Sequence, residues 1–193
     1  MKIGATIMRP ELEKQLCEKY PKIFKYCYAT ERYSCMYRGF EHNDGWFRIL
    51  DLLCEGIQSH IKYSRENRYS YLQRKRKIAE MQKNNTFQEY LENYYKYVST
   101  EEEKEKRISN AIIDSSIILG EEPEAVKQVV AQQVKEKFGG LRFYYYGGDE
   151  FICGLVNFAE RLSSITCESC GRDGKIVGTN WLRCLCKDCN KNE

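Results

Sequence analysis

Two pairs of cysteines near the C-terminal end of the chain have the spacing of a metal site. Two residues separate Cys167 from Cys170, two separate Cys186 from Cys189, and fifteen residues lie between the two pairs. Four thiolates in two such knuckles are typical ligands of tetrahedral zinc. The spacing is a strong signal, and it predicts a zinc ribbon over residues 167–193.

The predicted zinc is structural rather than catalytic. Cys184 competes for the third ligand position, but only Cys186 repeats the knuckle spacing with Cys189, so we leave Cys184 out. A closed site of four sulfurs has no coordination position for a water molecule. Because the segment is short and polar, metal binding would supply the free energy that folds it, on the order of 10 kcal/mol in small zinc modules.

The chain has ten cysteines and no opening segment that resembles an export signal. Cytosolic glutathione opposes structural disulfides, so these residues are expected to be reduced thiols or metal ligands. Five cysteines are scattered along the chain, and we expect them to be small buried apolar side chains. The scattered cysteines are Cys17, Cys27, Cys35, Cys54 and Cys153.

The stretch Gln132–Gly147 mixes cations and aromatic residues around Gly139 and Gly140. If these glycines form a two-residue hairpin turn, which requires positive φ, their flanks become antiparallel strands. The side chains of the second strand then alternate between two faces. One face carries Arg142, Tyr144 and Tyr146, and the other carries Leu141, Phe143 and Tyr145.

The polar face of this hairpin is predicted to bind an anionic, nucleotide-type ligand. Arginine forks match phosphate oxygens, and aromatic rings stack on bases. Trp46 would add a stacking partner, and Asp44 lies at the same corner, although an aspartate before a helix is more commonly an N-cap. Most of the aromatic residues in the stretch are expected in the core. The predicted ligand set is Lys135, Lys137, Arg142, Tyr144, Tyr146, Trp46 and Asp44.

The chain before the hairpin allows two interpretations. Val126, Val130, Val134 and Phe138 recur every four residues, which indicates a helix that begins at Pro123. The run LRFYYYG is typical of a strand. We predict a helix from Pro123 to about Val130 and a hairpin after it, while a single helix as far as Phe138 stays open.

Amphipathic helices are predicted on both sides of the hairpin. One such segment lies between Pro10 and Pro21, and another runs from Trp46 to Ile61. After the hairpin, five apolar residues at helical spacing would dock a last helix on the sheet. These five residues are Phe151, Leu155, Phe158, Leu162 and Ile165.

Residues 64–120 have a charge pattern of their own and are predicted to form an inserted helical lobe. Lys62–Lys83 is strongly basic, and Glu101–Glu105 is acidic. The basic run, which includes Arg74–Lys77, is either a phosphate-contacting face or a solvated helix surface, and the second interpretation is commoner for a charge run. An aromatic stripe on this lobe would form its core or an interface between subunits of a homo-oligomer.

The predicted fold class is α+β, with a small antiparallel sheet packed by amphipathic helices, an inserted helical lobe and a C-terminal zinc ribbon. Residues 1–63 and 121–166 would build the α+β core, residues 64–120 the insertion and residues 167–193 the ribbon.

Composition and motifs exclude several function classes. The net charge of +3 is too small to indicate a nucleic-acid partner by itself. No run approaches 18 consecutive apolar residues, so we expect a soluble, cytoplasmic protein without a membrane partner. The sequence has no Ser-His-Asp order, no HExxH motif and no Walker-type loop, so we predict that the protein is not an enzyme.

Four motifs together resemble a group of small proteins encoded by bacteriophages and prophages. They are LCEKYPKIF, the Asp44-Gly45-Trp46 corner, VKEKFGGLRFYY, and FAERLSSITCESCGRDGKI followed by WLRCLCKDC. The resemblance covers about residues 11–63 and 128–189, and Cys189 stands where that group often has histidine. It implies an accessory protein inside an infected bacterial cell, but it implies no activity.

The first expected function is a non-enzymatic protein that captures a nucleotide-type ligand or a host defence protein, in keeping with a phage setting. The alternative is nucleic-acid binding through the basic helix and the ribbon. A hydrolase or nuclease is less favoured, because it would need facing carboxylates from Asp44, Glu41 or Glu136. The basic residues of the ribbon are Arg172, Lys175, Arg183 and Lys187.

Overall fold

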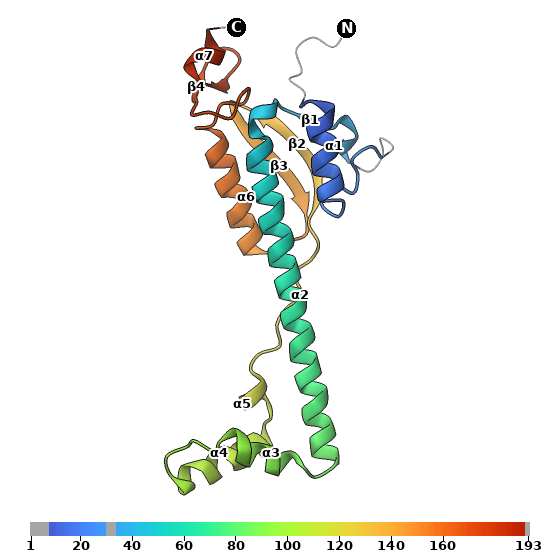
Figure 1. Ribbon diagram of the computed structural model, residues 1–193, viewed down its shortest axis with the longest axis vertical. Helices are drawn as coiled ribbons and strands as arrows, with labels where there is room; N and C mark the ends of the chain where they lie inside the picture. The colour runs from blue at the N-terminus through green and yellow to red at the C-terminus, as the bar shows by residue number, and fades with distance from the viewer. Residues whose placement is uncertain (1–7, 30–33, 192–193) are drawn as a thin grey trace. The chain divides into compact units, whose positions relative to one another are not determined.

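The computed structural model of the protein describes residues 8–29 and 34–191. It combines helices with a small sheet, so the α+β class expected from the sequence is confirmed (Figure 1). None of the helices in the described part of the chain is long and apolar enough to cross a membrane.

The chain divides into two compact units. The first comprises Met1–Ile61 together with Val126–Glu193, and the second comprises Lys62–Ala125. The range expected for the insertion was 64–120. Helix α2, Phe47–Lys83, contributes its beginning to the first unit and its remainder to the second.

The sheet of the first unit has three strands in the order β1-β2-β3. Strand β2, Val130–Lys137, and strand β3, Gly140–Tyr146, form the predicted antiparallel hairpin. The short edge strand β1, Phe40–Glu41, pairs in parallel with β2, so the complete sheet is mixed rather than wholly antiparallel. A parallel neighbour requires a long crossover connection, and here the whole segment between β1 and β2 supplies it.

The hairpin turn lies one residue earlier than predicted. Lys137 pairs with Gly140, so the two central residues are Phe138 and Gly139, with φ values of 55° and 77°. Two successive residues with positive φ match the right-handed twist of the strands, and glycine is the residue that adopts this conformation most easily.

The predicted helix over Pro123–Val130 is wrong, because residues 122–129 form no helix and Val130 begins a strand. A β-bulge interrupts the register between Ala131 and Gln133. The bulge adds one residue, so the buried side chains of Ala131 and Val134 are three residues apart, as in a helix. An irregular strand therefore imitates helical periodicity.

Three helices cover the inner face of the sheet. Helix α1, Pro10–Lys19, lies on the same side as the beginning of α2 and helix α6, Glu150–Ser163 (Figure 1). The residues between them form one apolar core. Its largest fully buried side chains include Trp46, Phe40, Met8, Leu16, Ile23, Leu50, Ile57, Leu141 and Ile152.

Helix α6 is rotated relative to the orientation predicted from its apolar residues. Its buried residues are Ile152, Val156, Ala159 and Ser163. The residues expected to dock on the sheet instead form an outward stripe, here called the α6 stripe, in which three side chains are 55–67% exposed. The stripe comprises Phe151, Leu155, Phe158, Leu162 and Ile165, of which Leu155 and Leu162 are half-buried and do pack against the core.

Hydrogen bonds along the free edge of β3 explain this rotation. The backbone N–H of Leu141 donates to Ser163 Oγ at 2.8 Å, and that of Phe143 donates to Glu160 Oε1 at 2.9 Å. An uncovered edge strand leaves such amides without partners, so a helix that presents polar side chains to the edge satisfies them. This requirement turns the apolar stripe away from the sheet.

The second unit is helical. It contains the remainder of α2 and helices α3, Phe87–Tyr94, α4, Glu101–Ile113, and α5, Ser116–Leu119. Helix α4 has a side-chain N-cap, because Thr100 Oγ1 accepts a hydrogen bond from the backbone N–H of Glu103. The apolar core of this unit contains Tyr71, Ile78, Phe87, Leu91, Ile108, Ala111 and Leu119.

Candidate metal centre and ligand-binding surfaces

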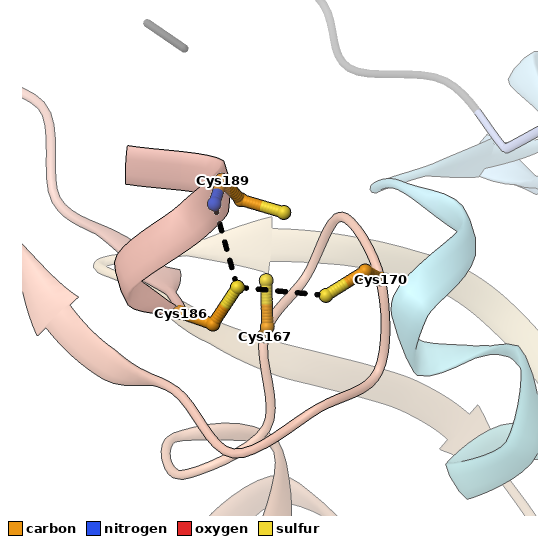
Figure 2. Close-up of side chains that lie close together, drawn as sticks. All are labelled: Cys167, Cys170, Cys186 and Cys189. Atoms are coloured by element: carbon orange, nitrogen blue, oxygen red, sulfur yellow. Dashed lines mark hydrogen bonds between the residues drawn. The ribbon is translucent and has the colours of Figure 1, made fainter. Parts of the chain in front are cut away.

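Four cysteine sulfurs converge after the end of α6 (Figure 2). The Sγ atoms of Cys167, Cys170, Cys186 and Cys189 all lie within 4.8 Å of one another, and those of Cys170 and Cys186 are 3.6 Å apart. A Zn–S bond of about 2.3 Å in a tetrahedral site implies sulfur separations of roughly 3.8 Å. The four cysteines predicted from their spacing could therefore hold one metal ion.

Short regular elements place these ligands. Strands β4, Lys175–Val177, and β5, Arg183–Leu185, form a hairpin that joins the two knuckles, and helix α7, Lys187–Asn190, follows. Cys186 is the N-cap of α7, and its Sγ accepts a hydrogen bond from the backbone N–H of Cys189 at 3.4 Å. This bond favours the thiolate form of Cys186.

Cys184 lies outside the cluster, as predicted. Its side chain is completely buried, and its Sγ donates a hydrogen bond to the carbonyl oxygen of Ser164 at 3.2 Å. Burial raises the pKa of the Cys184 thiol to about 11. A neutral thiol that donates to a carbonyl is not a metal ligand, because metals bind the thiolate.

Arg172 supports the sulfur cluster electrostatically. Its Nε donates to Cys170 Sγ at 3.4 Å, its Nη2 to Cys186 Sγ at 3.7 Å, and its Nη1 to the Asp188 carboxylate at 2.7 Å. The guanidinium lowers the pKa of the Cys170 thiol to about 6. The sequence suggested Arg172 only as a nucleic-acid contact, whereas the structure directs it toward the ligands.

The Asp44-Gly45-Trp46 corner is where the first knuckle docks. The backbone N–H of Gly45 donates to the carbonyl oxygen of Glu168 at 2.7 Å. A Cβ on Gly45 would lie 2.6 Å from that oxygen and would clash with the carbonyl oxygen of Cys167. Only glycine allows the two backbones to approach so closely. The corner comprises 3-10 helix η2, Asp44–Trp46, which leads into α2.

Glu168 joins the corner to residues 167–191, here called the metal module. It is completely buried, and its carboxylate accepts from the backbone N–H of Asn43 at 3.1 Å and from Arg183 Nε at 3.2 Å. A buried charge with both an ion-pair partner and a backbone donor is compensated. The role of Glu168 was not predicted, and the only signal for it in the sequence is its position directly after Cys167.

Two predicted ligand residues at the corner have internal roles instead. Trp46 is completely buried, and its Nε1 donates to the carbonyl oxygen of Thr166 at 2.8 Å, so it has no surface on which a ligand could stack. The Asp44 carboxylate accepts from the backbone N–H of Arg9 at 2.8 Å and pairs with its guanidinium. The expectation that Asp44 caps the following helix is therefore wrong as well.

The other predicted ligand residues lie on the hairpin. Lys135 pairs in register with Arg142, so both belong to the solvent-facing side of the sheet, and the Lys135 ammonium lies 5.5 Å from the centre of the Tyr144 ring. Tyr144 is 43% exposed and Tyr146 is 72% exposed. Lys135, Arg142, Tyr144 and Tyr146 are here called the outer sheet face. Lys137 lies beside the turn, 5.3 Å from the Phe138 ring centre.

Arg142 also borders a small recess of about 320 Å³ between the hairpin turn and α6. Its Nη1 donates to the carbonyl oxygen of Leu141 at 2.6 Å and lies 3.8 Å from Glu160 Oε2. Arg161 lines the same recess and has no ion-pair partner among the described residues. The recess thus holds two cations and one carboxylate.

The basic residues of the alternative nucleic-acid site are only partly free. Arg183 is paired with Glu168, and Arg172 with Asp188, whereas Lys175 and Lys187 are exposed. Arg74–Lys77 is an exposed run on α2, in which Lys75 pairs with Glu122 at 3.1 Å.

The expectation that all scattered cysteines are buried is also corrected. Cys54 is completely buried, but Cys35 and Cys153 are exposed, and Cys17 and Cys27 are intermediate.

A larger apolar groove of about 870 Å³ lies between α6 and the beginning of α2. Leu155, Phe158 and Leu162 of the α6 stripe line one wall, and Leu52 of α2 lines the other. The groove was not predicted from the sequence, because the same apolar residues were expected to contact the sheet.

Comparisons of the chain with protein-family models, with curated proteins and with solved structures gave no match.

Proposed function

We propose that the protein is a non-enzymatic binding protein whose outer sheet face holds single-stranded nucleic acid. The observation that carries this proposal is the placement of two half-buried cations and two exposed phenols on one side of a single hairpin, with Lys135 in register with Arg142. Proteins usually bind single-stranded nucleic acid with cations placed along its phosphate backbone and with aromatic rings on which its bases stack. Solvent-facing sheets bind RNA in this way.

The openness of the face favours a strand over a small nucleotide. The groove and the recess described above are not lined by Lys135, Tyr144 or Tyr146. A small ligand needs a concave site that removes most of its surface from water, whereas a strand gains affinity from repeated contacts along an open surface. We therefore place the polymer first.

A nucleotide-type small molecule is the second candidate, and the recess beside the hairpin turn supports it. Arg142 and Arg161 would contact its phosphates, and the exposed ring of Phe138 would face its base. This candidate ranks lower because the carboxylate of Glu160, which lines the same recess, would repel a phosphate.

The metal in this proposal is zinc, and its role is structural. Four sulfur ligands suit zinc and leave no position for water. The site would fix the module that docks on the Asp44-Gly45-Trp46 corner. The resemblance to phage-encoded proteins supports a setting in an infected bacterium, where a host defence protein is a further proposed partner.

Fluorescence anisotropy with labelled 12-mers of uridine and thymidine tests the proposal. We expect binding that weakens as salt rises, with a slope of about 0.7 per phosphate contact on logarithmic axes. Tyr144→Ala should weaken binding about tenfold through lost stacking. Lys135→Gln should weaken it more than Lys106→Gln, a control that removes an equal charge from an exposed position on α4.

Absence of binding to both oligomers, or equal effects of Lys135→Gln and Lys106→Gln, would contradict the outer sheet face as the site. Calorimetry with mononucleotides distinguishes the second candidate, a nucleotide-type ligand in the recess, from the first. Loss of mononucleotide binding in Arg161→Gln, with oligomer binding absent, would move the function to the recess.

A further inference from the structure

The α6 stripe is an apolar surface that the first unit covers only in part, because Leu155 and Leu162 pack against the core and the Phe151 ring stacks on His60 at 4.3 Å. Phe151 is 55% exposed, Phe158 is 67% exposed and Ile165 is 61% exposed. Leu52, on the opposite wall of the groove, is 50% exposed. Scattered apolar residues are common on protein surfaces, but a continuous stripe beside an apolar groove marks an interaction site.

The spacing of the stripe is that of a coiled-coil seam. Its five residues follow one another at intervals of four, three, four and three positions. In heptad terms the leucines Leu155 and Leu162 occupy a positions, and Phe151 and Phe158 occupy d positions. Such a seam fits the seam of another helix, since each side chain inserts between side chains of its neighbour.

The order of residues makes the stripe complementary to itself when two copies run antiparallel. In that arrangement the a positions of one helix face the d positions of the other, so each layer combines a leucine with a phenylalanine. Leu155 then faces Phe158 of the second copy, and Leu162 faces Phe151. Alternating small and large side chains across facing positions fills space without gaps.

Charge supports the same pairing. Arg161 and Glu150 are exposed on the flank of α6, and neither has an ion-pair partner among the described residues. The antiparallel register brings Arg161 of one copy beside Gly154 of the second copy and within reach of its Glu150. The twofold symmetry makes this contact twice.

The antiparallel pairing explains why a glycine occupies position 154, whereas packing inside the unit does not. A Cβ at this position would meet nothing within 4 Å, so no internal contact requires glycine there. Glycine in the interior of a helix costs about 1 kcal/mol relative to alanine. On the flank of a helix pair, it leaves room for the arginine of the second copy.

We propose that the protein forms a twofold homodimer in which the α6 stripes of two copies pack antiparallel over the grooves between α2 and α6. The dimer does not depend on the proposed nucleic-acid function. It also differs from an interface through the helical lobe, which the sequence suggested.

Sedimentation velocity of the full zinc-loaded chain from about 1 to 100 μM tests the dimer. We expect a concentration-dependent dimer, and Phe158→Glu should weaken its association constant at least tenfold. The matched control is Ile113→Glu on α4, because Ile113 is 85% exposed and lies outside the stripe. Metal content and far-UV circular dichroism should be unchanged in both variants, since neither side chain is buried.

A charge exchange tests the antiparallel register. Arg161→Glu and Glu150→Arg should each weaken the dimer a few fold, and the double variant should recover most of the loss. A chain that is monomeric over the whole range, or a dimer that Phe158→Glu leaves intact, would refute the proposal. Additive losses in the double variant would refute the antiparallel register.

Discussion

The metal module differs from the two outward surfaces of the first unit, which are the outer sheet face and the α6 stripe. The module uses its charged side chains for internal contacts, whereas the outward surfaces expose aromatic side chains to solvent. In the module, Glu168, Arg183 and Arg172 all have ion-pair partners inside the unit. On the outward surfaces, Tyr146 and Phe158 are more than two-thirds exposed. The first set of contacts holds the fold together, while the second set remains available to other molecules.

This difference separates stability from binding within one compact unit. The ring of Trp46 is as suitable for stacking as that of Tyr144, but Trp46 is completely buried and donates to Thr166. Burial, rather than residue type, decides which role an aromatic residue has. Changes at the module should therefore lower stability, whereas changes at the α6 stripe or the outer sheet face should alter binding at nearly constant stability.

Removal of the metal should have the largest effect on stability. In small zinc modules, binding supplies on the order of 10 kcal/mol of folding free energy. We expect one zinc per chain by elemental analysis, and a chelator should unfold residues from Cys167 onward and lower the melting temperature. Cys186→Ser should lose the metal, whereas Cys35→Ser should retain it, because Cys35 lies outside the cluster.

Retention of a full equivalent of metal in Cys186→Ser would contradict the four-sulfur site. Loss of metal without any change in melting temperature would contradict its structural role.

The contrast between the regions also explains what could be predicted from the sequence. The cysteine ligands were predictable, because each knuckle is set by residues three positions apart. The corner contacts were not, since 120 positions separate Trp46 from Thr166 and 125 separate Asn43 from Glu168. Nothing local in the sequence marks such pairs.

The strand and helix errors have the same physical origin. The bulge after Ala131 changes the spacing of buried residues, and bulges depend on pairing with another strand. The rotation of α6 depends on the amides of β3, which bond to Ser163 and Glu160. The alternation along β3 was predictable, because it needs only the period of a strand.

Gly45→Ala should have the next largest effect. The new Cβ would crowd the backbone of Cys167, Glu168 and Gly171, and backbone atoms cannot move aside as a flexible side chain can. We expect a loss of about 3 kcal/mol in chemical denaturation, with weaker metal retention. Gly154→Ala is the control, since its Cβ meets nothing, and it should stabilise the monomer by up to about 1 kcal/mol.

Equal stabilities of the two glycine variants, measured at a concentration where the chain is monomeric, would show that the corner is not a tight contact.

Acidification should weaken the corner through His42. Its ring is completely buried near Trp46, Nδ1 lies 2.8 Å from the carbonyl oxygen of Asn43, and Nε2 has no hydrogen-bond partner among the described residues. Burial lowers the pKa of His42 to about 4. The folded chain thus favours the neutral ring, so this contribution to stability is complete above about pH 6.5 and is lost as the pH falls toward 4.

The expected loss from His42 between pH 7 and pH 5 is about 2 kcal/mol. His42→Leu should remove this part of the pH dependence, whatever it does to stability at pH 7, and denaturation at both pH values in excess zinc measures it. An unchanged difference between the two pH values in His42→Leu would assign the acid sensitivity to other groups.

Arg172→Gln should have the smallest effect, and it tests whether the module's charges act on the metal. The guanidinium donates to two ligand sulfurs, but it is exposed, so solvent screens its charge. We expect zinc to transfer to a chelator about tenfold faster. This is the lower limit of the effects seen when a residue that hydrogen-bonds to a metal ligand is removed. Lys187→Gln, which removes an exposed cation from the same module, should leave the rate nearly unchanged. If both variants accelerate zinc loss equally, the effect comes from net charge, and the hydrogen bonds from Arg172 to the sulfurs do not help to hold the metal.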